Sequence, residues 1–191
     1  MSVLEDDAIL EGESGGDRLG TALDATGDLN GDGYADLVAG APEDDNGDVN
    51  GGGVMVVFGE PSFSGTLTFD ARLLGGQYRA RAGSSVAVVE DIDGNNRDEL
   101  LVGAPGASVG SASSGLAYFV LGGGLSGTSI LDDEGILIVG EGEGDAAGAS
   151  VADAGDFDGD GVSDLLVGAP GHSGVYADGG AAYLLSGVLL R

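Results

Sequence analysis

Short apolar runs alternate with segments rich in glycine and aspartate along the whole chain. The runs are bounded by glycine or proline and lack the three- to four-residue spacing of apolar positions that marks an amphipathic helix. This pattern predicts short β-strands joined by tight turns. The expected strands form three sets of similar order behind one leading strand: 8–12; 21–26, 35–42, 53–59 and 71–75; 84–90, 100–105, 115–122 and 135–140; 149–154, 165–170 and 180–187.

The third strand of each set is apolar almost throughout, as in the GLAYFVLG of residues 115–122. A strand with one solvent-facing side alternates apolar and polar residues, whereas a continuous apolar run is typical of a strand buried on both faces. We therefore expect these strands in the interior of a stack of sheets.

A second pattern lies between the first two strands of each set. In the first set, oxygen-bearing side chains stand at Asp28, Asn30, Asp32 and Asp36. Ca²⁺ takes six to eight oxygen ligands, and a tight loop supplies them from positions 1, 3 and 5, the backbone carbonyl of position 7 and a later acid. These four side chains and the carbonyl of Tyr34 follow that order, which predicts a calcium loop.

Glycines fit the same interpretation, because a chain that wraps a cation needs residues that adopt positive φ at low cost. Gly31 and Gly33 stand at the expected turns. An EF-hand loop would begin in the same way, but it needs a bidentate glutamate at position twelve, where this chain has Ala39. A strand, not a helix, is therefore expected after the loop.

The loop occurs three times in register. The first aspartates lie 63 and 65 residues apart, and the prolines of the three Gly-Ala-Pro segments keep the same intervals. By charge the third loop is expected to bind Ca²⁺ most tightly and the second most weakly, because Asn96 and Glu99 replace glycine and aspartate there. The positions that correspond to the five predicted ligands of the first loop are Asp91, Asp93, Asn95, the carbonyl of Arg97 and Glu99 in the second loop, and Asp156, Asp158, Asp160, the carbonyl of Val162 and Asp164 in the third.

Together, the upstream glycine, the calcium loop and the (V/A)-G-A-P strand resemble the FG-GAP repeats of integrin alpha-subunit β-propellers and their bacterial relatives. The phenylalanine of the "FG" is absent, since Leu19, Ala82 and Ala147 take its place. The resemblance implies an all-β fold of three four-stranded propeller blades with about three Ca²⁺, one per repeat. We expect a single repeat domain, residues 1–191, with repeats at about 13–75, 76–140 and 141–191.

The third repeat lacks its final strand, while the strand at residues 8–12 has no blade before it. Since a propeller usually needs at least four blades, we expect two chains to pair head to tail as a six-bladed ring, each donating this strand to the third blade of the other. A nine-bladed trimer is an alternative, and so is a chain that forms part of a longer propeller.

The amino-acid composition limits the classes of molecule that the protein can bind and the compartment in which it acts. The chain has 33 acidic and 6 basic residues and a net charge of −27, so nucleic acid and anionic membranes are unfavourable partners. It has no cysteine, and no segment reaches the length of a membrane span. Because such loops need more calcium than resting cytosol supplies, we expect an extracellular or cell-surface location, although the N-terminus lacks the apolar stretch of a signal peptide.

These observations favour a non-enzymatic, Ca²⁺-binding module for extracellular adhesion or protein recognition. A scaffold half-propeller without its own ligand is one alternative. A calcium-dependent hydrolase is another, but metal ligation accounts for every regularly spaced acid, and the single histidine, His172, is expected to be solvated. Recognition is expected in the loops at 43–52, 106–114 and 171–179. The first of these loops is acidic enough to hold a further cation, but the irregular spacing of its acids favours a solvated acidic turn. The arginines near Tyr78 form either an interface or a solvated loop.

Overall fold

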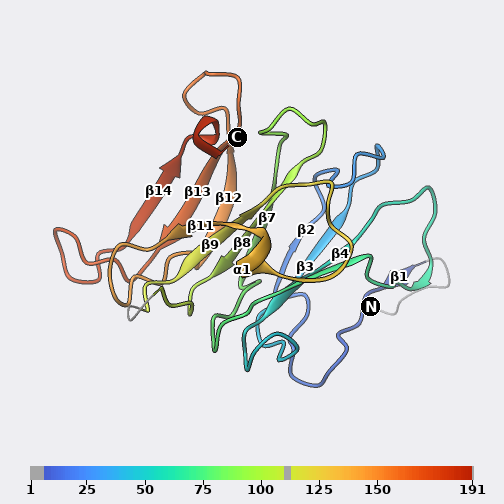
Figure 1. Ribbon diagram of the computed structural model, residues 1–191, viewed down its shortest axis with the longest axis horizontal. Coiled ribbons are helices and arrows are strands. Elements are labelled where there is room, and N and C mark those ends of the chain that lie inside the picture. Colours follow the sequence, from blue (N-terminus) through green and yellow to red (C-terminus); the bar gives the residue numbers. More distant parts are fainter. Residues whose placement is uncertain (1–6, 110–112, 191) are drawn as a thin grey trace.

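The computed structural model describes residues 7–109 and 113–190, and its strands form three main sheets that stand side by side, with a separate pair of short strands (Figure 1). No helix among these residues is long and apolar enough to cross a lipid bilayer. In chain order the elements are β1 (Ala8–Ile9), β2 (Ala22–Asp24), β3 (Leu37–Ala41), β4 (Gly53–Val57), β5 (Gly65–Thr66), β6 (Ala71–Leu74), β7 (Ser85–Val89), β8 (Glu99–Ala104), β9 (Leu116–Val120), β10 (Gly127–Ile130), α1 (Leu131–Glu134), β11 (Ile136–Val139), β12 (Ser150–Gly155), β13 (Asp164–Ala169), β14 (Ala181–Leu185) and the 3₁₀ helix η1 (Gly187–Leu190).

The main part of each sheet is an antiparallel meander built by one repeat, as expected. The first contains β2, β3, β4 and β6, the second β7, β8, β9 and β11, and the third β12, β13 and β14. The Gly-Ala-Pro segments end the second strand of every sheet. The candidate calcium loops therefore lie at one end of the sheets, and the loops at 43–52 and 171–179 join strands at the opposite end. Of the third loop expected to serve recognition, 106–114, residues 110–112 lie outside the described residues.

Two pairings depart from a simple set of four-stranded blades. β10, which comes from the second repeat, runs parallel to β6 and makes the first sheet five-stranded. The N-terminal strand β1 runs parallel to β5 beside the first sheet. The third sheet has only three strands, so the position that residues 8–12 were expected to fill in another copy is open in the single chain.

Two apolar layers hold the three sheets together. One lies between the first and second sheets and includes Val38, Leu100 and Tyr118, and the other lies between the second and third sheets and includes Phe119 and Leu165. As expected, β4 and β9 are buried on both faces. β14 instead alternates between half-buried and exposed positions, because no sheet of the described chain covers its far face.

The glycine of Gly-Ala-Pro is explained by contact between neighbouring sheets. A Cβ at Gly40 would lie 2.1 Å from the carbonyl oxygen of Gly83, and one at Gly103 would lie 2.0 Å from that of Gly148. Both approaches are far inside van der Waals contact, so only glycine fits. At Gly168, where no fourth sheet follows, the nearest atom is a serine hydroxyl of the same sheet.

Candidate metal centre

The three acidic loops connect β2 to β3, β7 to β8 and β12 to β13, and their backbones follow the same course. Gly31, Gly94 and Gly159 have φ of +81°, +81° and +79°. Two residues further on, Asn96 has φ of +62° where the other loops have glycine. Asparagine is one of the few non-glycine residues that adopt this conformation readily, so the substitution is accommodated.

The first aspartate organises each loop by accepting backbone N–H groups. Asp28 Oδ1 accepts from Gly31 at 2.7 Å, and its Oδ2 accepts from Gly33 at 2.7 Å. Asp91 does the same with Gly94 at 2.7 Å and Asn96 at 2.8 Å. In the third loop Asp156 accepts from Gly161 at 3.0 Å. The loop is thus folded around the carboxylate that was predicted as its first ligand.

The last acid of each loop is buried at the start of the following strand. Asp36, Glu99 and Asp164 are 0%, 0% and 1% exposed. Each carboxylate accepts the N–H of the residue that follows the first aspartate, at 2.7, 2.7 and 3.1 Å. Burial raises the pKa of Asp36, and the charges of Asp28 and Asp32 raise it further. These groups are therefore positioned inside the loop but are unfavourable as isolated charges.

The acidic side chains gather more closely in the second and third loops than in the first. Asp91, Asp93 and Glu99 each present an oxygen within 4.8 Å of the others, and so do Asp156, Asp158 and Asp160. Asp164 lies outside the second of these groups. In the first loop the Asn30 amide donates to Asp32 at 2.9 Å, and its acids form no such group among the described residues.

Glu99 gives the strongest structural indication of a bound cation. Its Oε2 accepts one backbone N–H, whereas Oε1 is buried without a hydrogen-bond partner. Burial raises the pKa of Glu99 to about 7, with a further contribution from the charges of Asp93, Asp91 and Asp98. A cation between these carboxylates would satisfy the unpaired oxygen and offset both effects, so the residues present fit a hard, oxygen-preferring metal.

The residues predicted to ligate through their carbonyls differ in the placement of their side chains. Tyr34 is 44% exposed, while Val162 is 8% exposed and packs with residues of the second sheet. The side chain of Arg97 reaches across to the first loop, where its Nε donates to the carbonyl oxygen of Asn30 at 3.0 Å. The carbonyl ligation itself stays a prediction.

Asp98 is a functional candidate that the motif did not reveal. Its Oδ2 accepts the N–H of Asp28 at 2.7 Å, and its Oδ1 accepts that of Asp91 at 3.1 Å, so one carboxylate joins two loops. The other repeats have Ala35 and Ser163 at this position. An extra acid outside the repeated ligand pattern was the only signal available in the sequence.

At the opposite end of the sheets lies a cavity of about 620 Å³ between the first two repeats. Its lining includes Tyr78, Arg79, Arg81 and Ser108. Arg81 pairs with Glu43 at 2.9 Å, whereas the Arg79 guanidinium lies 5.2 Å from the centre of the Tyr78 ring. Both Tyr78 and Arg79 are exposed. Of the two arginines at this cavity, Arg81 is thus ion-paired and Arg79 is open to solvent.

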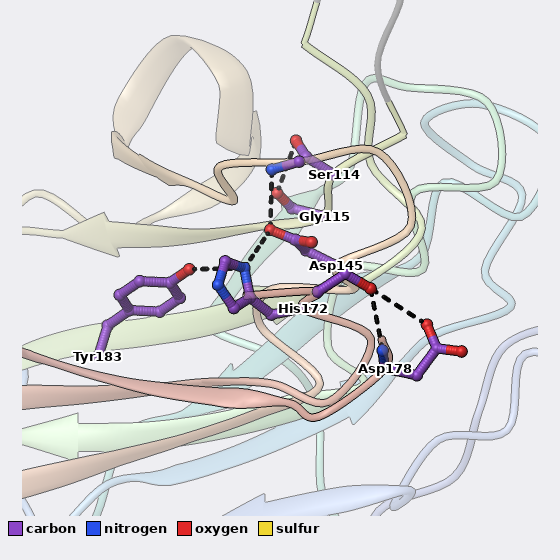
Figure 2. A network of polar contacts seen from close by, with 8 residues as sticks. Ser114, Gly115, Asp145, His172, Asp178 and Tyr183 are labelled. Carbon is purple, nitrogen blue, oxygen red and sulfur yellow. Dashed lines mark hydrogen bonds and ion pairs between the residues drawn. The ribbon is translucent and has the colours of Figure 1, made fainter. Parts of the chain in front are cut away.

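The expectation of a solvated His172 was wrong. Its side chain is 22% exposed, and Nδ1 lies 3.1 Å from the carboxylate of Asp145, which is almost fully buried (Figure 2). Contact with His172 lowers the pKa of Asp145. The histidine is therefore part of a paired polar network and not a free surface residue.

Comparison with known proteins agrees with the repeat structure. The family model described as FG-GAP repeat matches residues 19–57, 82–120 and 147–185. Integrin alpha-PS5 of Drosophila melanogaster is 32% identical over 176 residues, which cover 88% of this chain and 16% of the relative. Integrin alpha pat-2 of Caenorhabditis elegans is 32% identical over 176 residues, or 85% of this chain and 13% of the relative.

The chain spans less than a fifth of the length of these curated relatives. The matched segments nevertheless cover most of its residues and coincide with β2 to β4, β7 to β9 and β12 to β14, which places each copy of the repeated motif on the same part of a sheet. FG-GAP repeats are β-propeller blades, and this chain belongs to the FG-GAP repeat family.

Proposed function

We propose that this protein is a non-enzymatic propeller module for extracellular adhesion or protein recognition, with structural Ca²⁺ in its three loops. Similarity to integrin alpha subunits supports the recognition role. The observation that carries the metal assignment is the buried, unpaired oxygen of Glu99 within a group of three acids. The side chains proposed as ligands are those of Asp28, Asn30, Asp32 and Asp36, of Asp91, Asp93, Asn95 and Glu99, and of Asp156, Asp158, Asp160 and Asp164, with the carbonyls of Tyr34, Arg97 and Val162.

In this proposal the metal acts on structure and not on a substrate. Bound Ca²⁺ supplies positive charge to loops whose carboxylates otherwise repel one another. Because each loop joins two strands of one sheet, calcium binding favours the folded arrangement of that sheet. The acids of the loops are thereby assigned to metal binding, which leaves no carboxylate pair at regular spacing for hydrolysis.

The recognition surface is proposed at the end of the sheets opposite the metal loops. Arg79 and Tyr78 are exposed beside the cavity of about 620 Å³, and Asn50, Ser108 and Ser113 add hydrogen-bonding groups to its wall. Arginine and tyrosine are the residue types that most often dominate the binding energy of protein interfaces. On a chain with 33 acidic residues, this exposed arginine would favour a carboxylate of a partner protein.

The test is binding to a panel of purified matrix proteins in CaCl₂ and in EDTA, measured by biolayer interferometry. We expect at least one calcium-dependent partner, whose affinity falls about tenfold in the Arg79→Ala variant, the usual effect of losing an interface hot spot. Arg18→Ala is the matched control, because Arg18 is 66% exposed but does not line the cavity. Binding that survives Arg79→Ala would place recognition elsewhere, and no binding at all would favour the scaffold role.

We further propose that two chains close a six-bladed ring. Leu166 and Leu184 are 37% and 45% exposed on the far face of the third sheet, while Leu101 and Phe119, at the same positions of the second sheet, are fully buried beneath the next one. The first sheet of a second copy, with Leu23 63% exposed, would cover this face as one blade covers another. Transfer of β1 to the open edge of β14 would complete the third blade.

Light scattering should then give a mass of twice 18.6 kDa at micromolar concentration. We expect Leu184→Asp to reduce the mass to that of one chain without unfolding it, because the side chain is already 45% exposed in the single chain. Leu137→Asp serves as the control, since Leu137 is 42% exposed on β11 and lies away from the proposed interface. A wild-type protein with the mass of a single chain would refute ring closure.

A further inference from the structure

Two buried aspartates face the same region at the end of the first sheet that lies away from the metal loops. Asp17 precedes β2 and Asp44 lies in the loop between β3 and β4, and the two are 5% and 0% exposed. The N–H of Glu43 donates to the carbonyl of Asp17 at 3.3 Å, which holds the two segments together. Neither residue belongs to the repeated calcium motif.

The hydrogen bonds of this pair leave one oxygen without a partner. Asp17 Oδ2 accepts the N–H of Ser14 at 2.9 Å, and Asp44 Oδ1 accepts that of Asn46 at 2.7 Å. Asp44 Oδ2 is buried and has no partner. The nearby arginines do not neutralise the pair, because Arg18 and Arg81 both contact Glu43 and no basic group lies within ion-pair distance of Asp17 or Asp44 in the described chain.

The three repeats build the same backbone frame around these two positions. The N–H at positions 44, 107 and 172 donates to the carbonyl three residues earlier at 3.1, 3.1 and 3.2 Å. The carbonyl of the same residue accepts from position 52, 115 or 180 at 3.0, 3.0 and 2.9 Å. The carbonyl at positions 17, 80 and 145 accepts from the N–H of residue 43, 106 or 171, at 3.3, 3.0 and 3.0 Å. The side chains at these positions can therefore be compared directly.

On this common frame the repeats differ in charge. The second has Ala80 and Ala107, which are 0% and 1% exposed and carry no charge. The third has Asp145 and His172, whose carboxylate and imidazole lie 3.1 Å apart, with the Tyr183 hydroxyl 3.4 Å from the same ring nitrogen (Figure 2). In the first repeat both positions carry acids, Asp17 and Asp44. Neither acid has an uncharged or a basic side chain as its counterpart.

We propose that Asp17 and Asp44 bind a divalent, oxygen-preferring cation such as Ca²⁺, in the place that the imidazole of His172 takes in the third repeat. Two carboxylates balance two positive charges, and the unpaired oxygen of Asp44 becomes a ligand. An adjoining cavity of about 350 Å³, lined by Ser14, Asp17, Glu43, Asp45, Asn46 and Asn50 among others, has room for water ligands and offers further oxygens.

The electrostatics of the pair agree with this assignment. Burial raises the pKa of Asp44, and the charge of Asp17 raises it further. An uncompensated carboxylate in such a place destabilises the fold, whereas a bound cation reverses the effect of both causes. The site is distinct from the three loops and adds a fourth cation to the chain, the second in the first repeat.

Calcium stoichiometry, measured by isothermal titration calorimetry on the whole chain, tests the site. Two variants place side chains at these positions that the same backbone frame already holds in another repeat. Asp17→Ala combined with Asp44→Ala gives the alanine pair of the second repeat, and Asp44→His gives the aspartate–histidine pair of the third. Each variant is expected to bind one Ca²⁺ fewer than the wild type. In EDTA, each variant is expected to melt at a higher temperature than the wild type. Asp133→Ala, which removes an exposed acid of α1, should change neither quantity.

The loops provide an internal reference, because Glu99→Gln should lower the stoichiometry separately from the Asp17 and Asp44 variants. An unchanged calcium count in both the alanine pair and Asp44→His would overturn the fourth site while leaving the loop sites intact. A higher melting temperature in EDTA without a change in count would show that the aspartates share a proton instead of a metal, and would also refute the proposal. The two variants differ in volume and charge, so a folding defect in one leaves the other to decide.

Discussion

Replacing Gly103 by alanine is expected to lower the free energy of unfolding by more than about 4 kcal/mol, the range of the most damaging single substitutions. The added Cβ would lie 2.0 Å from the carbonyl oxygen of Gly148 and 2.9 Å from its carbon. Both atoms belong to the backbone of the next sheet, so relief requires the second and third sheets to separate. Urea denaturation measures the loss.

Gly168→Ala is the matched control, since Gly168 occupies the same position in the third sheet. A Cβ at either glycine would meet a serine hydroxyl at 2.2 Å, from Ser85 or Ser150, and that side chain can rotate. Only Gly103 also faces the backbone of a following sheet. At a concentration where the protein is a single chain, Gly168→Ala should cost about 1 kcal/mol or less. Equal losses at the two sites would show that packing between sheets does not explain the motif.

The calcium-free protein is expected to lose stability as the pH rises from about 4.5 to 7, by up to about 3 kcal/mol from Glu99 alone. Burial raises the pKa of Glu99 to about 7 in the folded chain, while the unfolded chain titrates near the ordinary value of 4.5. Between these pH values the unfolded state releases a proton that the folded state retains, so raising the pH favours unfolding. Thermal melts in EDTA across this range measure the effect.

Calcium should reverse this dependence, because the metal stabilises the ionised carboxylate of Glu99. Glu99→Gln removes the titrating group, and its melting temperature in EDTA should therefore vary less between pH 4.5 and 7 than that of the wild type. Glu90→Gln removes an exposed acid just before the same loop and controls for the general repulsion of a chain with net charge −27. If Glu99→Gln and the wild type show the same pH profile, and calcium raises neither melting temperature, the metal assignment of this loop is wrong.

The repeat register was the part of the structure that could be predicted most fully. Evenly spaced Gly-Ala-Pro segments and loop aspartates predicted the order of the strands, and Asn96 adopts the positive φ of the glycine that it replaces. These predictions succeed because their physical causes are local. Turn geometry, backbone φ and the spacing of the loop acids all depend on a few consecutive residues.

The features that escaped prediction depend on distant parts of the chain. β10 has the sequence GTSI, which lacks the alternation of a core strand, and it pairs with β6 more than fifty residues earlier. Asp98 acts on Asp28 across the boundary between two sheets. His172 was taken for a surface residue because its partner, Asp145, lies 27 positions away and in no recognisable motif. Spacing within a repeat contains no information on such contacts.

At the end that bears the candidate metal loops, the two boundaries between sheets differ in the hydrogen bonds that cross them. Asp98, Arg97 and the N–H of Gly123 bind the backbone of residues 28–30 across the first boundary, whereas the described residues show no hydrogen bond across the second boundary at this end. In a stack of repeats each unit is held only by its neighbours. In the single chain the third sheet has three strands and one neighbouring sheet, so its detachment should need the least free energy. We therefore expect partial opening of the single chain to start at the third sheet, with the first two sheets retained as a paired unit.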